Sequence, residues 1–197
     1  MSSPRPPALV LASTSRYRRA LLERCGVPFS CEAPGVDESL AKRSRHAPAA
    51  IVRELAQQKA NAVAARHPHA IVVGSDQAAC IDGTMLDKPG TVAAACDQLE
   101  RLQGRTHELL TAVAVAHAGS LIEFTDTTRL TMRRLSRAEI ERYVAAEQPL
   151  DCAGSYKIEA LGVTLFERID CADWTAITGL PLLRLCHELR SLGLAMP

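Results

Sequence analysis

Short apolar runs alternate with segments of helical periodicity, and this alternation restricts most strongly how the chain can fold. The apolar runs occupy residues 8–12, 70–73 and 109–116. Residues 48–66 place Ile51 and Leu55 at helical spacing, and the pattern stops before Pro68. Strand-like runs separated by helices are typical of an α/β domain with a central sheet. We therefore expect an α/β fold with Lys59 on a helix.

The second half of the chain carries signals of paired strands. Asp82-Gly83 is a two-residue hairpin signal between residues 78–81 and 84–88, and Ala118-Gly119 joins extended segments at 106–117 and 120–133. The remaining expected elements are a helix at 91–102, a helix that begins with a Ser136 to Glu139 capping box and runs through 146, a strand at 163–169, and a last helix from Thr178 to Gly193. The long pairings indicate a bent mixed sheet flanked by helices, with two lobes around a central cleft.

Composition argues against several classes of protein. The chain of 197 residues has a net charge of +1 and 4% aromatic residues, so we expect neither a basic surface nor a stacking platform for nucleic acid. No apolar run approaches a membrane span and residues 1–7 lack the apolar core of a signal peptide, so we expect a cytoplasmic protein without membrane partners. We expect one domain over residues 1–197, with residues 1–7 as a flexible extension.

The cysteines and histidines do not predict a metal centre. Seven cysteines are scattered through apolar surroundings without a Cys-x-x-Cys pair, so we expect reduced core residues. Cys186 and His187 are neighbours on a predicted helix and point in different directions, which disfavours a thiol nucleophile with its base. The histidines lack the spacing of a helix-borne zinc site.

Residues 13–19 form a hydroxyl- and arginine-rich turn between a strand and a helix. The first N–H groups of a helix have no intrahelical partners and lie at the positive end of its dipole, so they attract anions. Arginine adds a planar charged fork that suits phosphate. Taken alone, the turn is also explained by a serine that caps the helix while the arginines face solvent.

Charged residues elsewhere complete a set suited to a polyphosphate. Asp76 follows an apolar strand, where α/β sheets hold ligands. Carboxylates such as Asp76 and Glu38 suit a divalent cation or a water, and lysines suit phosphate oxygens. Each residue has its own structural explanation, as a turn, a cap or a surface charge, but the set matches hydrolysis of a phosphoanhydride. Neither a P-loop nor a Gly-x-Gly-x-x-Gly motif occurs.

Five motifs in order resemble the Maf family, from about Leu9 to the last predicted helix. They are Leu-Ala-Ser-x-Ser-x-x-Arg-Arg at 11–19, Val-Asp-Glu at 36–38, Gly-Ser-Asp-Gln at 74–77, Lys-Pro at 88–89 and Ala-Gly-Ser-Tyr-Lys at 153–157. The resemblance implies a Maf/ITPase-like domain and a nucleoside triphosphate pyrophosphatase that cleaves between the α and β phosphates. It also implies a divalent cation as cofactor, Mg²⁺, Mn²⁺ or Co²⁺.

The resemblance also implies roles for individual residues. Asp76 matches the general base and Glu38 would assist the metal or the water, so these two are the candidate metal ligands. The residues that would neutralise developing charge are Lys59, Lys88 and Lys157. The residues that would bind phosphate are Ser13, Arg18, Arg19 and Lys157.

Three positions resemble the branch of the family that acts on 7-methyl-GTP, namely Tyr17, Gln77 and Glu159. The branch acting on dTTP and UTP typically has a basic residue, Thr and Gln there. The base of 7-methyl-GTP is cationic, so an aromatic face and a carboxylate favour it. Tyr17 is also explained as a helix residue that packs on the sheet. The chain departs from the family pattern at Arg16, where many members have proline, and at Gln58, where Glu commonly precedes the lysine.

Other functions stay open at this stage. One is a dTTP and UTP pyrophosphatase of the same family, and another is a nucleotide-binding regulator of cell division without significant hydrolysis. A nucleic-acid binder is disfavoured by the balanced charge and the few aromatic residues. The expected partner is a nucleoside triphosphate, and the expected role is removal of modified nucleotides. The sequence does not decide the oligomeric state, and a homodimer stays open.

Overall fold

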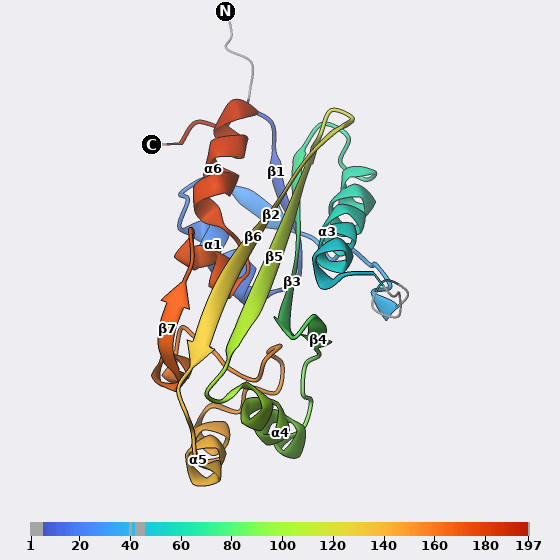
Figure 1. The fold of residues 1–197 in the computed structure, drawn as a ribbon. Coiled ribbons are helices and arrows are strands. Elements are labelled where there is room, and N and C mark those ends of the chain that lie inside the picture. The colour runs from blue at the N-terminus through green and yellow to red at the C-terminus, as the bar shows by residue number, and fades with distance from the viewer. Residues whose placement is uncertain (1–5, 40, 42–45, 197) are drawn as a thin grey trace, which may run out of the picture. The chain divides into compact units, whose positions relative to one another are not determined.

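The structure is a computed structural model, and it describes residues 6–39, 41 and 46–196. These residues form helices and a seven-stranded mixed sheet (Figure 1), so the expected α/β class is confirmed. The strand order is β2-β1-β3-β5-β6-β7, and β4 pairs with β3. The strands are β1 (Leu9–Ala12), β2 (Phe29–Cys31), β3 (Ile71–Ile81), β4 (Thr84–Leu86), β5 (Thr106–His117), β6 (Ser120–Met132) and β7 (Phe166–Asp170).

Five α-helices and two 3-10 helices connect the strands in the described part of the chain. The α-helices are α1 (Arg16–Glu23), α3 (Pro48–Ala64), α4 (Val92–Leu102), α5 (Arg137–Glu147) and α6 (Leu182–Ser191). The 3-10 helices are η1 (Leu161–Leu165) and η2 (Trp174–Thr178). The chain divides into two compact units, which we describe separately.

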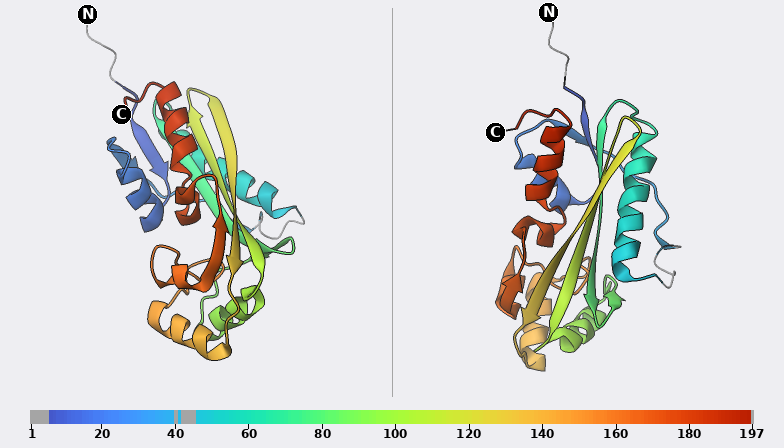
Figure 2. Two further views of the ribbon diagram at one scale, coloured as in Figure 1. Left: turned by 60° about the vertical axis from the view of Figure 1, so that its left-hand side comes forward. Right: turned by 45° about the horizontal axis from the view of Figure 1, so that its top comes forward.

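Unit 1 comprises Met1–Gln77, Thr111–Asp126 and Asp173–Pro197. In this unit β1 pairs in parallel with both β2 and β3, and the β1–β3 register runs from Leu9 beside Ile71 to Ala12 beside Gly74. Helix α3 lies on one side of these strands, and α1 and α6 lie on the other (Figure 2). Leucines of α1 and α6 pack on β1 and β3 in one apolar cluster, which excludes water from that face of the sheet.

The structure corrects the position inferred for Asp76 along its strand. Strand β3 continues to Ile81, so Asp76 is not its last residue. The parallel pairing with β1, however, ends at Gly74. Asp76 therefore lies just beyond the carboxyl end of β1, which keeps the physical basis of the expectation.

Unit 2 comprises Ala78–Leu110 and Thr127–Ala172. Helices α4 and α5 pack against each other, and the rings of His107, Tyr156 and Phe166 form a cluster with centroids 4.9 to 5.9 Å apart. The β3–β4 turn has positive φ at Asp82 (50°) and Gly83 (72°), as the two-residue hairpin signal predicts.

Several predicted elements are confirmed and two are corrected. The strands at Thr106–His117 and Ser120–Met132 and the Ser136 capping box are present. The predicted strand at 163–169 is wrong in its first part, because Leu161–Leu165 is a 3-10 helix closed by a hydrogen bond from the Thr164 hydroxyl to the Leu161 carbonyl at 2.7 Å. The last helix begins at Leu182 rather than at Thr178, because the chain turns at Gly179 with a φ of 112°.

The cysteines and the chain start complete the comparison with the sequence. None of the seven cysteines forms a disulfide, but Cys31 and Cys171 are exposed, so the expectation of core residues is wrong for these two. Of the expected N-terminal extension, residues 1–5 lie outside the described residues. No helix in the described ranges is long and apolar enough to cross a membrane.

Candidate active site

The centre of the candidate site is a buried lysine between two carboxylates of unit 1. Lys59 Nζ donates to Asp76 Oδ1 at 2.6 Å and lies 2.7 Å from Glu38 Oε1. The Lys59 and Asp76 side chains are 8% and 9% exposed, whereas Glu38 is 35% exposed. A buried charge persists in a fold when an opposite charge compensates it. The cluster therefore keeps an ionic Lys59–Asp76 pair inside the unit, with Glu38 on its solvent side.

A glycine in β3 brings α3 close enough to make this pair. A Cβ at Gly74 would lie 2.4 Å from the carbonyl oxygen of Ala56 and 2.6 Å from the backbone nitrogen of Ala60, both on α3. These distances are shorter than any real side-chain contact, so only glycine permits this packing. Lys59 lies on the same face of α3 and Asp76 on the same strand. Gly74 is therefore a structural condition for the ion pair.

Arg18 is held beside this cluster by a backbone carbonyl. Its Nε donates to the Gly179 carbonyl oxygen at 3.1 Å, and the hydroxyl of buried Ser75 donates to the same oxygen at 2.9 Å. Burial lowers the pKa of Arg18, and the negative charges of Asp76 and Glu38 oppose that effect. The positive charge of the guanidinium therefore interacts with both carboxylates.

The other residues of the opening turn differ in where their side chains lie. Ser13 is buried, and its Oγ accepts from the Ser15 backbone nitrogen at 3.1 Å. Ser15 is the residue that caps α1, through its Oγ and the Arg18 nitrogen at 3.4 Å. Arg19 is exposed and pairs with Glu23 at 3.0 Å, where both residues line a surface pocket of about 450 Å³ beside β2. The Arg19 guanidinium therefore pairs with Glu23 at the surface of unit 1.

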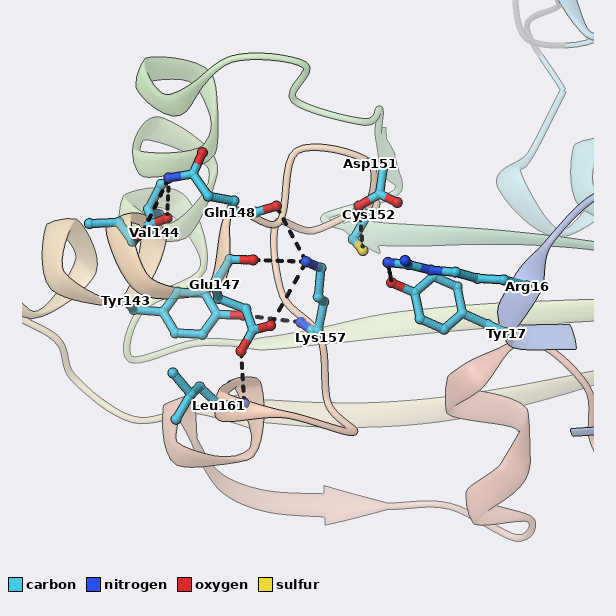
Figure 3. A network of polar contacts seen from close by, with 11 residues as sticks. Arg16, Tyr17, Tyr143, Val144, Glu147, Gln148, Asp151, Cys152, Lys157 and Leu161 are labelled. Carbon is cyan, nitrogen blue, oxygen red and sulfur yellow. Dashed lines mark hydrogen bonds and ion pairs between the residues drawn. The ribbon is translucent and has the colours of Figure 1, made fainter. Parts of the chain in front are cut away.

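Two of the three predicted selectivity positions lie in unit 1. The Arg16 guanidinium stacks over the Tyr17 ring at 4.7 Å and donates to the Tyr17 hydroxyl at 2.7 Å, as Figure 3 shows. The amide nitrogen of Gln77 donates to Thr111 Oγ1 at 2.8 Å and to the carbonyls of Ala176 and Ile177. Tyr17 therefore already contacts a cation, and Gln77 is fixed by hydrogen bonds.

The remaining predicted residues lie in unit 2. Lys157 Nζ donates to the backbone carbonyls of Glu147 and Gln148, at 2.8 and 3.4 Å, and lies 3.8 Å from the Glu147 carboxylate (Figure 3). Lys88 follows β4 and is exposed, and Glu159 is exposed in the turn before η1. Among the described residues neither the Lys88 nor the Glu159 side chain forms an ion pair or a hydrogen bond.

Sequence reasoning missed the residues that hold the predicted side chains. Gly179 and Thr111 lie 161 and 34 positions from Arg18 and Gln77, the residues they bind, so no local pattern links them. The only local signal is the Thr178-Gly179-Leu180-Pro181 run, because glycine and proline are both residues that favour turns.

The carboxylate pair suits one kind of metal site. No group of three or more His, Cys, Asp or Glu that could hold a metal occurs among the described residues. Magnesium sites in nucleotide enzymes, however, use one or two carboxylates plus substrate phosphates. Asp76 and Glu38 converge on one ammonium and so offer this donor set. The residues therefore fit a cation that binds together with a polyphosphate.

Comparison with known proteins defines the class. A model of the Maf family, described as "Maf-like protein", matches residues 8–192, and the chain belongs to the Maf family. Individual relatives are described by an activity and not only by the family. A 7-methyl-GTP pyrophosphatase of Aromatoleum aromaticum is 51% identical, with 96% of this chain and 97% of that protein covered. Proteins with the same description from Xanthomonas oryzae and Bdellovibrio bacteriovorus are 48% and 44% identical and also match nearly full length.

Proposed function

We propose that this protein is a nucleoside triphosphate pyrophosphatase that hydrolyses 7-methyl-GTP to 7-methyl-GMP and pyrophosphate. Two independent lines support the proposal. Full-length relatives 44% to 51% identical carry this description. The observation that carries the chemistry is the Lys59 ammonium held between the Asp76 and Glu38 carboxylates. Carboxylates can accept a proton from water or hold a divalent cation, and an ammonium can neutralise charge that develops on phosphate oxygens.

In the proposed mechanism, Asp76 accepts a proton from the attacking water. Oxygen of that water bonds to a phosphorus of the α–β bridge, the bridging P–O bond breaks, and its electron pair leaves with the departing phosphate group. Lys59 orients the Asp76 carboxylate by donating to Oδ1, so that Oδ2 is left to receive the proton. Asp76 and Glu38 would hold a divalent cation, which would supply Lewis-acid polarisation of a phosphate oxygen.

Arg18 has a separate task in this proposal. Its Nε is bound to the Gly179 carbonyl, so the two terminal amino groups are the donors left for phosphate oxygens. Lys88 and Lys157 are proposed to neutralise charge on the phosphate chain, with Ser13 and Arg19 as further phosphate ligands. For this role Lys157 exchanges backbone carbonyls for phosphate oxygens, and Arg19 leaves Glu23.

A nucleotide panel tests the reaction and the base preference together. Purified protein is incubated with 7-methyl-GTP, GTP, dTTP and UTP, each with Mg²⁺, Mn²⁺ or Co²⁺, and pyrophosphate release is measured. We expect the largest kcat/KM with 7-methyl-GTP and loss of activity with excess chelator. Faster turnover of dTTP and UTP would move the protein to the other branch. A nucleotide-dependent rise in Tm without pyrophosphate release would favour a binding protein.

A further inference from the structure

The side-chain nitrogen of Gln77 lies near more hydrogen-bond acceptors than it has N–H groups. Its Nε2 donates to Thr111 Oγ1 at 2.8 Å, to the Ala176 carbonyl at 2.8 Å and to the Ile177 carbonyl at 3.2 Å. An amide nitrogen has only two N–H groups, which these three oxygens share. Two of the oxygens are backbone carbonyls that only accept, so turning the amide over would place oxygen against oxygen. The nitrogen of Gln77 is therefore fixed toward η2.

Thr111 completes this arrangement from β5. It is 1% exposed, and its hydroxyl donates to the Ala176 carbonyl at 2.9 Å. Because the hydroxyl hydrogen is directed at Ala176, the lone pairs of Oγ1 are available to the amide of Gln77. Thr111 thus acts on Gln77 twice, directly and through a shared carbonyl.

The segment that supplies the carbonyls is itself fixed by a buried carboxylate. Asp173 is 4% exposed, and its Oδ1 accepts from the Thr175 nitrogen at 2.9 Å and the Thr175 hydroxyl at 2.5 Å. Its Oδ2 accepts from the Leu183 nitrogen at 2.7 Å, and Thr175 Oγ1 accepts from the Leu182 nitrogen at 2.8 Å. These bonds tie η2 to the start of α6, so the carbonyls facing Gln77 have a defined position.

The consequence concerns the oxygen of the amide. Gln77 is half-buried, and its Oε1 has no hydrogen-bond partner among the described residues. Among the described residues, only Nδ1 of His107 is a side-chain nitrogen or oxygen that is both fully buried and without a partner. Oε1 of Gln77 has no partner either, so it is not fully buried. A ligand can therefore reach it. It presents an acceptor and not a donor.

We propose that Thr111 is a positioning residue for nucleotide selection, which holds Gln77 so that Oε1 accepts a hydrogen bond from an N–H group of the base. The ligand class is a nucleotide whose base turns a ring N–H or an exocyclic amine toward this acceptor, as guanine does. This inference rests on the proposed function, because it takes the nucleotide as the ligand of Gln77.

The first test compares Thr111→Val with Thr111→Ser in steady-state hydrolysis. Valine keeps the shape and removes the hydroxyl, so KM should rise about threefold to tenfold while kcat changes little. Serine keeps the hydroxyl and should restore KM to within twofold of the wild type. Thr128→Val makes the same change at an equally buried position of unit 2 and should leave KM unchanged. An unchanged KM in Thr111→Val, or equal KM values in both Thr111 variants, would overturn the proposal.

The second test is Gln77→Glu, which separates orientation from charge. A carboxylate has the same shape as the amide but cannot donate to the Ala176 and Ile177 carbonyls, so it should turn away from its present position. We expect KM for 7-methyl-GTP to rise at least tenfold, although a negative charge would otherwise attract a cationic base. A lower KM than the wild type would show that the amide orientation does not matter.

The wild-type panel keeps the two proposals distinguishable. If another nucleotide is hydrolysed best, the proposed substrate is wrong, and the same variants are then compared on that nucleotide. If no nucleotide is hydrolysed, the rise in Tm caused by each nucleotide replaces KM as the readout. In both cases a Thr111→Val variant that discriminates nucleotides as the wild type does contradicts the role of Thr111.

Discussion

Lys59 in unit 1 and Lys157 in unit 2 are both largely buried, but their partners differ in kind. Lys59 Nζ contacts two carboxylates, at 2.6 and 2.7 Å. Lys157 Nζ contacts mainly the carbonyls at the end of α5, and its nearest carboxylate oxygen is 3.8 Å away. Carbonyls at a helix C-terminus carry only partial negative charge. Lys59 is thus part of a fixed ionic centre, whereas Lys157 has weaker partners that phosphate oxygens can replace.

The largest effect is expected from Asp76→Asn, which removes the proposed proton acceptor that pairs with Lys59. Asparagine keeps the shape and the hydrogen bond acceptor but cannot take up a proton, and positioned general bases typically contribute about 10² to 10⁴ in rate. We expect kcat/KM for 7-methyl-GTP to fall about 10³-fold, measured by pyrophosphate release. Asp37→Asn, at an exposed neighbour of Glu38, should stay within about threefold of the wild type. Retention of more than a tenth of the activity by Asp76→Asn would exclude Asp76 as the base.

The next prediction compares Lys59 and Lys157 by the loss in free energy of unfolding when each is replaced. Lys59→Met removes the cation that pairs with the buried Asp76 carboxylate, and removing one partner of a buried pair typically costs about 3 kcal/mol or more. Lys157→Met leaves only carbonyls and one carboxylate at the edge of hydrogen-bond reach, so we expect about 1 kcal/mol. Chemical denaturation of both variants measures the two free energies of unfolding. Equal losses would mean that the kind of partner does not distinguish these lysines.

The same contrast explains what the sequence predicted and what it did not. The resemblance to the family implies the roles of Asp76, Lys59 and Glu38. Local periodicity predicts the helix that carries Lys59 and the first part of the strand that carries Asp76. The Arg18 and Gln77 partners were not predicted, because the Gly179 and Ala176 carbonyls are backbone atoms about one hundred or more positions away. Backbone acceptors leave no side-chain pattern in a sequence. Only the fold shows which carbonyl meets which donor.

Unit 2 also contains a buried base, and it should make the protein sensitive to acid. Burial lowers the pKa of His107 from 6.5 to about 4, and its Nε2 lies 2.9 Å from the Tyr156 hydroxyl. The unfolded chain therefore binds a proton below pH 6.5 that the folded chain binds only near pH 4. The free energy of unfolding is therefore unaffected by His107 above pH 6.5. It falls as the pH falls from 6.5 to about 4, by up to about 3 kcal/mol.

Denaturation of the wild type and His107→Phe at several pH values between 7 and 4 measures this loss. Phenylalanine fits the ring cluster but does not titrate, so its free energy of unfolding should fall less steeply with acid. The variant loses the bond to Tyr156, so the slope and not the absolute stability is the readout. Parallel pH profiles would show that His107 does not carry this dependence.

The smallest effect concerns Arg16, which stacks on Tyr17, the residue proposed to contact the base of the nucleotide. Its guanidinium lies 4.7 Å from the centre of the Tyr17 ring and donates to the Tyr17 hydroxyl at 2.7 Å. A cationic base that stacks on Tyr17 has to displace it, and an exposed cation–π contact contributes about 0.5 to 1 kcal/mol. Arg16→Ala should therefore lower KM for 7-methyl-GTP about twofold to fivefold.

Arg16→Gln is the matched variant, because it keeps a donor for the Tyr17 hydroxyl without a charge. If the cationic base has to displace the Arg16 charge from Tyr17, Arg16→Gln and Arg16→Ala should lower KM for 7-methyl-GTP by similar factors. KM for GTP, whose base is neutral, should change less. If Arg16 instead binds phosphate, both substitutions raise KM for both nucleotides, because every nucleoside triphosphate carries the same phosphate chain. The ratio of the two KM values thus separates competition at Tyr17 from a phosphate contact at the same arginine.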